Sequence, residues 1–419
     1  MKRLLNILLL LSIIFSTNIC VAQNPSKTIL LVSGWQDVNI GDIAHTPGLI
    51  HVLNCFVPEA DIILWEKSTS EYVDELINKY YPKVKIIHGQ VNENLTVDNQ
   101  EIYDAFDKAD IMIHGSGPFV VAKSHLEAWM KHTKGKPFGV FGVTIEKMDE
   151  QLKNVLSKAA FVYTRETQSL QFLKDNGISG NHVSFAPDAT FYLNIKNDAK
   201  AQKFLYDNRL KEKEYICMVP RLRVTPYYKI ANRHKWSMKR IIEVEEYNND
   251  HKQEEHTKLR DCIVEWVRKT GKKVVICPEM TYQVDIMDEL LVDSLPFDVK
   301  PYVVKHSYWM PDEAASLYAH AYAVLSMDCH SPIIACANGT PFFYFRQPED
   351  TSKGQMYYDL NFHNWIFDID KVESSSIIKQ LFEVKGNYKQ SVEHIAAEMD
   401  VITDIYKGAC EKIRAVLNL

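Results

Sequence analysis

Beyond its first 22 residues, the sequence has no apolar run that approaches the roughly 18 to 20 residues of a membrane-spanning helix. It also has no stripe of clustered Lys and Arg, and its formal net charge of -6 is mildly acidic. A basic surface for nucleic acid is therefore excluded, because such surfaces need concentrated positive charge. No short internal repeat and no low-complexity tract is present.

Metal-binding cysteine patterns are missing as well. The chain has eight cysteines, all scattered, with no CxxC pair and no His at zinc-finger spacing. Most have apolar neighbours, so we interpret them as buried small side chains. One disulfide is the alternative, and the sequence does not indicate which cysteines would form it. His and Asp are nowhere spaced along the sequence as ligands, so we predict no metal and no cofactor.

The first 22 residues have the pattern of a secretory signal peptide. Lys2 and Arg3 precede a long apolar stretch, and small residues up to Ala22 offer a cleavage site. We therefore expect a secreted or periplasmic protein. Cleavage would remove two basic residues and no acidic one, which changes the formal net charge from -6 to -8. Cys20 follows Ile19 where a lipoprotein signal has a small residue, so a lipid anchor is the less favoured alternative.

The rest of the chain alternates short apolar β-type runs with helical spacings. This alternation predicts an α/β fold, and roughly 400 residues exceed the usual size of one core. We therefore expect two doubly wound, Rossmann-like domains that face a cleft. The expected units are a signal peptide (1–22), an N-terminal domain (23–195), a C-terminal domain (196–385) and a C-terminal helix packed back on the N-terminal domain (386–419).

The individual segments follow from the same patterns. A charged stretch, residues 232–261, is interpreted as a helical excursion with a mostly solvated face. The main predicted helices cover residues 44–56, 257–270, 312–321 and 391–417. The main predicted strands cover residues 28–33, 60–65, 84–87, 137–143, 215–219, 273–277, 299–305, 323–326 and 342–345.

Ligands of doubly wound domains bind beyond the carboxyl ends of the strands, so polar residues there are candidate site residues. Asn39, Gly41 and Asp42 follow the first strand in a turn that leads into a helix, whose N-terminus attracts anions. Asn39 and Asp42 could instead only shape the turn and cap the helix.

A glycine-rich turn follows the apolar run that begins at residue 110. Gly115 and Gly117 flank Ser116, and residues without a side chain permit a close approach of the backbone to a ligand. His114, directly before this turn, either faces the ligand or is a satisfied, half-buried imidazole.

Charged residues end three further strands. Arg165 and Glu166 either serve a ligand or form a structural ion pair. Arg221 and Arg223 suit a carboxylate on the ligand, with a surface salt bridge as the alternative. Glu279 could meet a substrate carboxyl or hydroxyl group.

Residues 311–341 are the most informative stretch, because helix, short strand, polar turn, helix, glycine and strand follow in order. The polar turn carries Asp328 and His330. Imidazole suits proton transfer near neutral pH, so we predict that His330 is catalytic and that Asp328 orients it or acts as an acid. Arg346 and Lys353 lie on the loop after the next strand.

These residues resemble the polysaccharide pyruvyl transferase family, whose members attach a pyruvate ketal from phosphoenolpyruvate to a sugar. The resemblance implies the two-domain fold of B-type glycosyltransferases and an active cleft lined by residues 39–42. It rests on His330, Ala335, Gly339 and Pro341, and on four upstream matches: residues 39–42, the turn at 115–117, Arg165 and Glu166 with Ser169, and Pro187 with Asp188.

One departure from the family pattern affects the expected chemistry. The family usually has Arg two residues before this His, and here that residue is Asp328. Arg clamps a carboxylate or phosphate, whereas Asp repels both. Arg221 and Arg223 then become the best remaining cationic anchors.

The resemblance implies an enzyme that acts on pyruvate ketal groups of a polysaccharide or oligosaccharide. Phosphoenolpyruvate is a partner only if the protein is a true transferase. An exported enzyme would lack this cytoplasmic donor, so a secreted hydrolase that removes pyruvate ketals is one alternative. A non-catalytic glycan-binding protein, with Trp236 and Trp309 as stacking platforms, is another.

Overall fold

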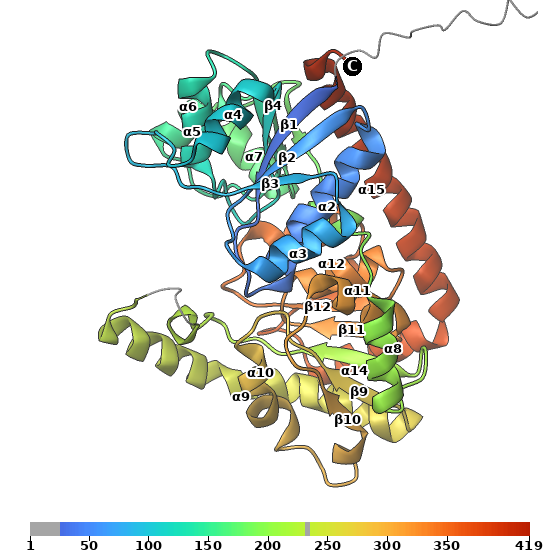
Figure 1. The fold of residues 1–419 in the computed structure, drawn as a ribbon. Coiled ribbons are helices and arrows are strands. Elements are labelled where there is room, and N and C mark those ends of the chain that lie inside the picture. The colour runs from blue at the N-terminus through green and yellow to red at the C-terminus, as the bar shows by residue number, and fades with distance from the viewer. Residues whose placement is uncertain (1–25, 231–234) are drawn as a thin grey trace, which may run out of the picture.

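The computed structural model describes residues 26–230 and 235–419, which form two α/β domains (Figure 1). Each domain contains one parallel sheet whose strands are connected by helices. The predicted fold class, two doubly wound Rossmann-like domains, is confirmed. The expected signal peptide lies outside the described residues. None of the helices within residues 26–230 and 235–419 has the length and apolar character needed to span a membrane.

The N-terminal sheet has seven strands in the order β3-β2-β1-β4-β5-β6-β7. The interior strand β1 is apolar on both faces, and its residues 29–32 are fully buried, as expected of a parallel strand covered on both sides. The strand order reverses between β1 and β4, where a crevice forms in this class of fold.

The strands of this sheet are β1 Lys27–Ser33, β2 Ala60–Glu66, β3 Lys85–Ile87, β4 Ile111–His114, β5 Phe138–Val143, β6 Phe161–Thr164 and β7 Val183–Phe185. The helices of this domain are α2 Ile40–Phe56, α3 Glu71–Tyr80, α4 Gln100–Lys108, α5 Lys123–His132, α6 Glu150–Leu156, α7 Thr167–Asp175 and the short 3-10 helix η1 Ala189–Tyr192.

The C-terminal sheet has six strands in the order β10-β9-β8-β11-β12-β13, so its strand order reverses between β8 and β11. Its strands are β8 Tyr215–Val219, β9 Lys273–Ile276, β10 Val303–Lys305, β11 Ala323–Ser326, β12 Phe342–Arg346 and β13 Ile366–Asp368. The remaining α-helices are α8 Asp198–Asp207, α9 Met238–Thr270, α10 Gln283–Met287, α11 Pro311–His320, α12 His330–Ala337, α13 Gln355–Asp359, α14 Ser374–Gly386 and α15 Tyr388–Leu417.

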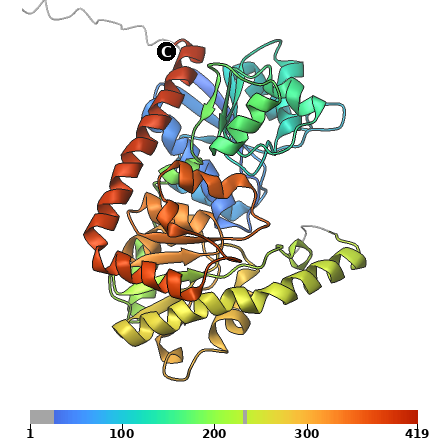
Figure 2. The same ribbon diagram turned by 180° about the vertical axis from the view of Figure 1, so that it is seen from behind.

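Two predicted segments differ from the structure. The charged excursion and the helix expected at residues 257–270 form one helix, α9, of 33 residues, which begins after the cap Ser237. Its N-terminal half extends away from the C-terminal sheet (Figures 1 and 2). The strand expected at residues 299–305 is limited to β10, because the 3-10 helix Lys300–Tyr302 takes up its first half.

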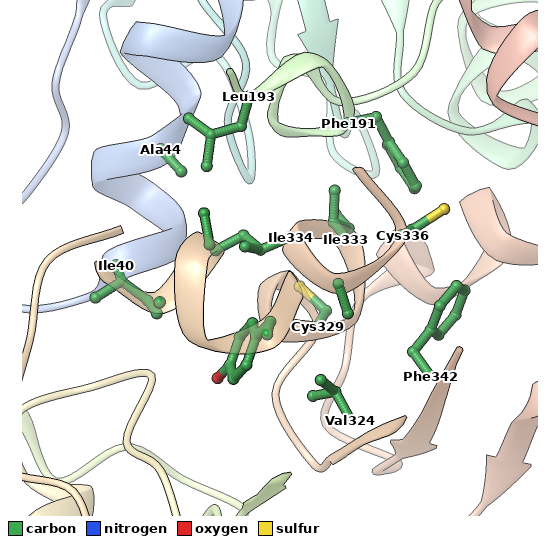
Figure 3. Close-up of a cluster of buried hydrophobic side chains, with 14 of the residues drawn as sticks. Ile40, Ala44, Phe191, Leu193, Val324, Cys329, Ile333, Ile334, Cys336 and Phe342 are labelled. Carbon is green, nitrogen blue, oxygen red and sulfur yellow. The ribbon is translucent and has the colours of Figure 1, made fainter. Parts of the chain in front are cut away.

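Helix α12 joins the two domains through a shared apolar core (Figure 3). Ile334 of α12 lies beside Ala44 of α2 and Leu193, which follows η1, and Ile333 lies beside Phe191 of η1. Val324 and Phe342 of the C-terminal sheet lie on the other side of α12 (Figure 3). The start of α12 is therefore held against the N-terminal domain by close packing.

Backbone hydrogen bonds also join the domains beside α12. The Ile40 amide donates to the Glu279 carbonyl at 2.9 Å, and the Thr281 amide donates to the Val38 carbonyl at 3.0 Å. The loops after β1 and after β9 thus form a short antiparallel bridge, with Asn39 opposite Met280. This bridge fixes the distance between the two strand ends that face each other.

The last helix, α15, runs along both domains and ends beside the N-terminal sheet (Figures 1 and 2). The Tyr406 hydroxyl donates to the Asp188 carbonyl at 2.7 Å, and Arg414 pairs with Glu59 at 2.6 Å. The first of these contacts fixes the backbone at a residue of the candidate site.

Candidate functional site

The site is organised around the first turn of α12, where His330 begins the helix. The first amides of a helix have no partner within it. Here Glu279, after β9, accepts from the His330 amide at 3.3 Å and from the Ser331 amide at 2.6 Å. Its carboxylate also accepts from the Ser331 hydroxyl at 2.7 Å and lies 3.2 Å from His330 Nδ1. Glu279 therefore caps the helix and orients the His330 ring at the same time.

The other ring nitrogen of His330 faces the N-terminal domain. His330 Nε2 lies 3.1 Å from His45 Nε2 and 4.0 Å from Asp188 Oδ2. His45 Nε2 lies 3.1 Å from the same Asp188 oxygen. His45 is fully buried on α2, while 7% of His330 is exposed. His330 is therefore the member of the pair that a substrate can reach.

Asp188 is held by a buried arginine. Arg165 Nη1 lies 2.8 Å from Asp188 Oδ2, and Arg165 Nε donates to the Thr144 hydroxyl at 2.8 Å. The Thr190 amide donates to the other Asp188 oxygen at 3.0 Å. A buried charge pair of this kind is stable only with such further hydrogen bonds.

The electrostatics favour a charged carboxylate and a protonated imidazole. Burial alone would raise the pKa of Asp188, but His45, Arg165 and His330 hold the pKa of this carboxyl well below its usual value. Burial also disfavours a charged His330, but the Cys329 sulfur and the Glu279 carboxylate hold the pKa of the imidazole well above its usual value. His330 can therefore carry a proton near neutral pH and donate it.

The same groups have a spacing that could hold a metal ion. One ligand atom each from His45, Asp188 and His330 lies within 4.8 Å of the others, and all three residues are buried. Arg165 contacts the Asp188 oxygen that would serve as ligand, and its positive charge opposes a cation at that position. The arrangement suits a shared proton better than a metal ion.

A second buried cluster surrounds Asp328. Its carboxylate lies 3.4 Å from Arg221 Nε and accepts from the Gln283 amide group at 2.6 Å. Arg221 Nη1 pairs with Asp350 at 2.6 Å, and Lys353 pairs with the same Asp350 oxygen at 3.2 Å. Burial, together with the nearby Glu279 charge, raises the pKa of Asp328 to about 6.

The two clusters are adjacent, because Gln283 connects them. Its side-chain oxygen accepts from the Glu279 amide at 2.6 Å, while its amide group donates to Asp328. A rotation of Asp328 would therefore disturb the loop that carries Glu279.

The N-terminal signature lies directly against His330. The Asn39 side chain accepts from the Gly41 amide at 2.7 Å and from the Asp42 amide at 3.3 Å, so Asn39 caps α2. A Cβ atom at Gly41 would lie 2.1 Å from His330 Cγ, so glycine is needed for this approach. Asp42 is buried and bonds the Gln36 side chain.

The glycine-rich turn packs against its own domain. A Cβ at Gly115 would lie 2.8 Å from Ser33 Oγ, and one at Gly117 would lie 2.8 Å from Trp35 Nε1. Ser116 Oγ accepts from the Ala189 amide at 3.0 Å. These contacts within the domain are enough to explain why residues 115–117 are small, so a bound ligand is not needed for that explanation.

His114 is fully buried beside this turn, which leaves no face of the ring for a ligand. Its Nδ1 lies 2.7 Å from the Gly115 carbonyl, and its Nε2 accepts from the Ala122 amide at 3.1 Å. Burial lowers the pKa of His114 to about 3. The structure therefore favours the satisfied imidazole of the two alternatives.

Three further candidate residues have other partners. Glu166 caps α7 by accepting from the Ser169 amide at 2.6 Å, and it also accepts from the Ser352 hydroxyl at 3.1 Å across the domain junction. Arg223 pairs with Glu255 at 2.6 Å and also with Asp370. Arg346 lines a cavity of about 320 Å³ at the ends of β12 and β13, and none of His45, Asp188, Glu279 and His330 lines this cavity.

Sequence reasoning missed His45 as a site residue and noted Asp188 only as part of a matching motif. His45 lies one helical turn after Gly41, which is the one signal in the sequence that could have indicated it. The interpretation of Trp309 as a stacking platform is wrong. This side chain is 3% exposed, and its ring nitrogen donates to the Pro278 carbonyl at 2.7 Å.

Solved structures with the same two-domain fold support only the architecture. Anabaena HepE in complex with UDP-glucose is similar with a TM-score of 0.57, 11% identity and coverage of 94% of this chain and 100% of the other. A putative UDP-N-acetylglucosamine 2-epimerase from Listeria monocytogenes is similar with a TM-score of 0.56 and 10% identity, and the match covers 88% of this chain and 90% of the other. The E. coli ADP-heptose lipopolysaccharide heptosyltransferase II is similar with a TM-score of 0.52 and 11% identity, and the match covers 86% of this chain and 99% of the other.

Comparison with curated proteins gives no match. The family comparison does. The profile described as polysaccharide pyruvyl transferase matches residues 39–347, from the cap of α2 to the residue after β12. This range includes His45, Arg165, Asp188, Glu279 and His330. The chain belongs to the polysaccharide pyruvyl transferase family.

Proposed function

We propose that the protein is an enzyme that acts on pyruvate ketal groups of a glycan, with His330 as the proton donor and acceptor. The observation that carries this proposal is the position of His330, which Glu279 orients on one side and His45 with Asp188 contacts on the other. An imidazole that is charged, mostly buried and still reachable at one edge suits general acid catalysis.

In the transfer direction, His330 would donate its proton to the terminal carbon of the enolpyruvyl group. A sugar hydroxyl oxygen would then bond to the neighbouring carbon, and His330 would take the proton of that hydroxyl. A second hydroxyl would close the ketal as phosphate leaves with its proton. The cations of the two clusters that would have to bind the donor are Arg165, Arg221 and Lys353.

Ketal hydrolysis is a second candidate, and the charge balance at the site favours it. Arg165 pairs with Asp188, and both Arg221 and Lys353 pair with Asp350, so each cation already has a carboxylate partner. A phosphorylated donor would have to displace these partners. Hydrolysis needs only an acid to protonate a ketal oxygen and a water molecule, and it yields pyruvate and two sugar hydroxyls.

Export would agree with hydrolysis, because a secreted or periplasmic enzyme is separated from phosphoenolpyruvate. The proposed signal peptide is the sequence feature that supports export. The acid for this reaction would be His330, or Asp328 with its pKa of about 6.

The experiment measures pyruvate released from a pyruvylated polysaccharide and, in a parallel reaction, phosphate released from phosphoenolpyruvate with the plain polymer. Release of pyruvate without phosphoenolpyruvate identifies a hydrolase. Release of phosphate together with pyruvate gained by the polymer identifies a transferase. In either case His330→Ala is expected to lose about 100-fold or more in rate, the range of general acid catalysis.

The matched control is His363→Ala, which removes an exposed histidine away from the cluster and should keep full activity. Asp328→Asn tests the second acid, because hydrolysis at the full rate by this variant would exclude Asp328 as the group that protonates the ketal. Glycan binding without any turnover by the wild-type protein would reject the enzymatic proposal and favour a glycan-binding protein.

A further inference from the structure

Gln283, the first residue of α10, is fully buried and connects the two clusters. Its side-chain oxygen accepts from the Glu279 amide at 2.6 Å and from the Met280 amide at 3.0 Å. Backbone amides can only donate, so the carboxamide cannot bind there in the reversed orientation. Its nitrogen must therefore face the other way, where it donates to Asp328 Oδ2 at 2.6 Å.

Asp328 faces donors with both carboxylate oxygens. Oδ2 accepts from Gln283, and Oδ1 lies 3.4 Å from Arg221 Nε. The backbone of Asp328 is fixed by Ser326, whose hydroxyl donates to the Asp328 carbonyl at 2.7 Å and accepts from the Asp328 amide at 3.0 Å. The position of this carboxylate is therefore well defined, and it holds the nitrogen of Gln283 in one place.

The backbone of Glu279 is held on both sides. Its amide donates to Gln283, and its carbonyl accepts from the Ile40 amide at 2.9 Å. The Glu279 carboxylate contacts His330 Nδ1 and the first two amides of α12, and it keeps these contacts only while its backbone stays in place. A buried amide without an acceptor is costly, so loss of the Gln283 oxygen would displace the loop that carries Glu279.

We propose that Gln283 is a positioning residue that fixes the ring of His330. Asp328 holds the carboxamide of Gln283, the carboxamide holds the backbone of Glu279, and the Glu279 carboxylate holds the ring. The consequence for the reaction rests on the proposed function of His330. Of the two roles that the sequence leaves open for Asp328, this arrangement assigns the orienting one.

Gln283→Met tests this chain of contacts, because it removes both polar ends of the side chain at nearly the same length. Burial lowers the pKa of His330, and the Cys329 sulfur and the Glu279 carboxylate more than offset this effect. Displacement of Glu279 should therefore lower the pKa of His330 in an NMR titration of ¹⁵N-labelled histidines. In the assays of pyruvate and phosphate release, kcat should fall on the order of 10- to 100-fold, the cost of a displacement approaching 1 Å. KM should stay within roughly twofold, because the buried Gln283 does not reach the substrate.

Gln283→Glu separates the two ends of the side chain. One carboxyl oxygen can still accept from the Glu279 and Met280 amides, but the other meets the Asp328 carboxylate. Two neighbouring carboxylates repel each other unless they share a proton. The rate of Gln283→Glu relative to the wild type should therefore recover as the pH falls, whereas that of Gln283→Met should not. A side chain that only stabilised the loop would leave both ratios independent of pH.

Asn248→Leu is the matched control, because Asn248 is also a buried amide side chain that bonds two backbone groups. It is 4% exposed, and it contacts the amide and the carbonyl of Val224 at 2.9 Å each. The variant should lose stability in urea and keep both the kcat and the pKa of His330.

An unchanged pKa of His330 in Gln283→Met would overturn the inference. If Gln283→Met does not fold, the same titration of Gln283→Glu decides, since repulsion from Asp328 should also lower the pKa of His330. The outcome for the reaction is separate. A wild-type protein that releases neither pyruvate nor phosphate rejects the proposed function, whereas a lowered pKa of His330 in the variants still supports Gln283 as the residue that fixes the ring.

Discussion

Substitution of Gly41 by Ala tests whether the position of His330 controls the reaction. The new Cβ would lie 2.1 Å from Cγ, 2.2 Å from Nδ1 and 2.3 Å from Cβ of His330. Carbon atoms in contact are normally about 3.5 Å apart, so the two groups must separate by roughly 1.4 Å. The nearest atoms are at the base of the ring, so a simple rotation of the side chain does not relieve the clash.

The expected loss of activity is large and the loss of stability is small. A displacement of about 1 Å in a catalytic group costs on the order of 100-fold in rate, so Gly41→Ala should lose at least that much in kcat/KM. Crowding in a packed core costs about 1 to 3 kcal/mol. Alanine recovers up to about 1 kcal/mol, because Gly41 lies inside α2 and alanine favours helix.

A second measurement does not depend on the substrate. The Glu279 carboxylate, 3.2 Å from His330 Nδ1, helps to hold the pKa of His330 above its usual value. Separation of these groups should lower the pKa of His330, which a titration of ¹⁵N-labelled histidines by NMR would detect. The histidine signal is assigned by its absence in His330→Ala.

Gly408→Ala is the matched control, because a Cβ at this position in α15 meets no atom within 4 Å. It should keep full activity and an unchanged pKa of His330. If Gly41→Ala folds and keeps both its activity and the raised pKa of His330, the packing of Gly41 against this ring does not position it, and our account of the site is refuted.

Two further predictions concern stability. Burial raises the pKa of Glu66 to about 8, so this residue favours folding below its usual pKa of 4.5 and loses that contribution as the pH rises toward 8. The free energy of unfolding of Glu66→Gln minus that of the wild type, measured in urea, should therefore increase by on the order of 4 kcal/mol from pH 5 to pH 8. A difference that stays constant between these pH values would contradict the raised pKa. Tyr406→Phe removes a buried hydrogen bond to the Asp188 carbonyl and should cost about 1 kcal/mol, whereas Tyr206→Phe, at an 85% exposed side chain, should cost nothing measurable.

The strands were predictable because buried parallel strands are continuous apolar runs. The runs at residues 215–219 and 323–326 have the same bounds as β8 and β11. Helix α9 was not predicted as one element, because its N-terminal half is rich in charged residues and, up to residue 254, buries only Asn248, so it lacks the long apolar stripe of a packed helix. The strand bounds also placed Glu279, Asp328 and His330 beyond strand ends, where a doubly wound fold puts its ligands.

The sequence by itself determined the fold class, the family and the candidate role of His330, because periodicity and short motifs are local properties of the chain. The tertiary structure decided which groups act on His330. His45 and His330 are 285 positions apart, and only the packing of α12 between the two domains brings their ring nitrogens to 3.1 Å. The same packing decides that Glu279 orients this ring, whereas Arg223 pairs with Glu255 and Asp370. The distance between such residues depends on the whole fold, so no local pattern in the sequence can reveal it.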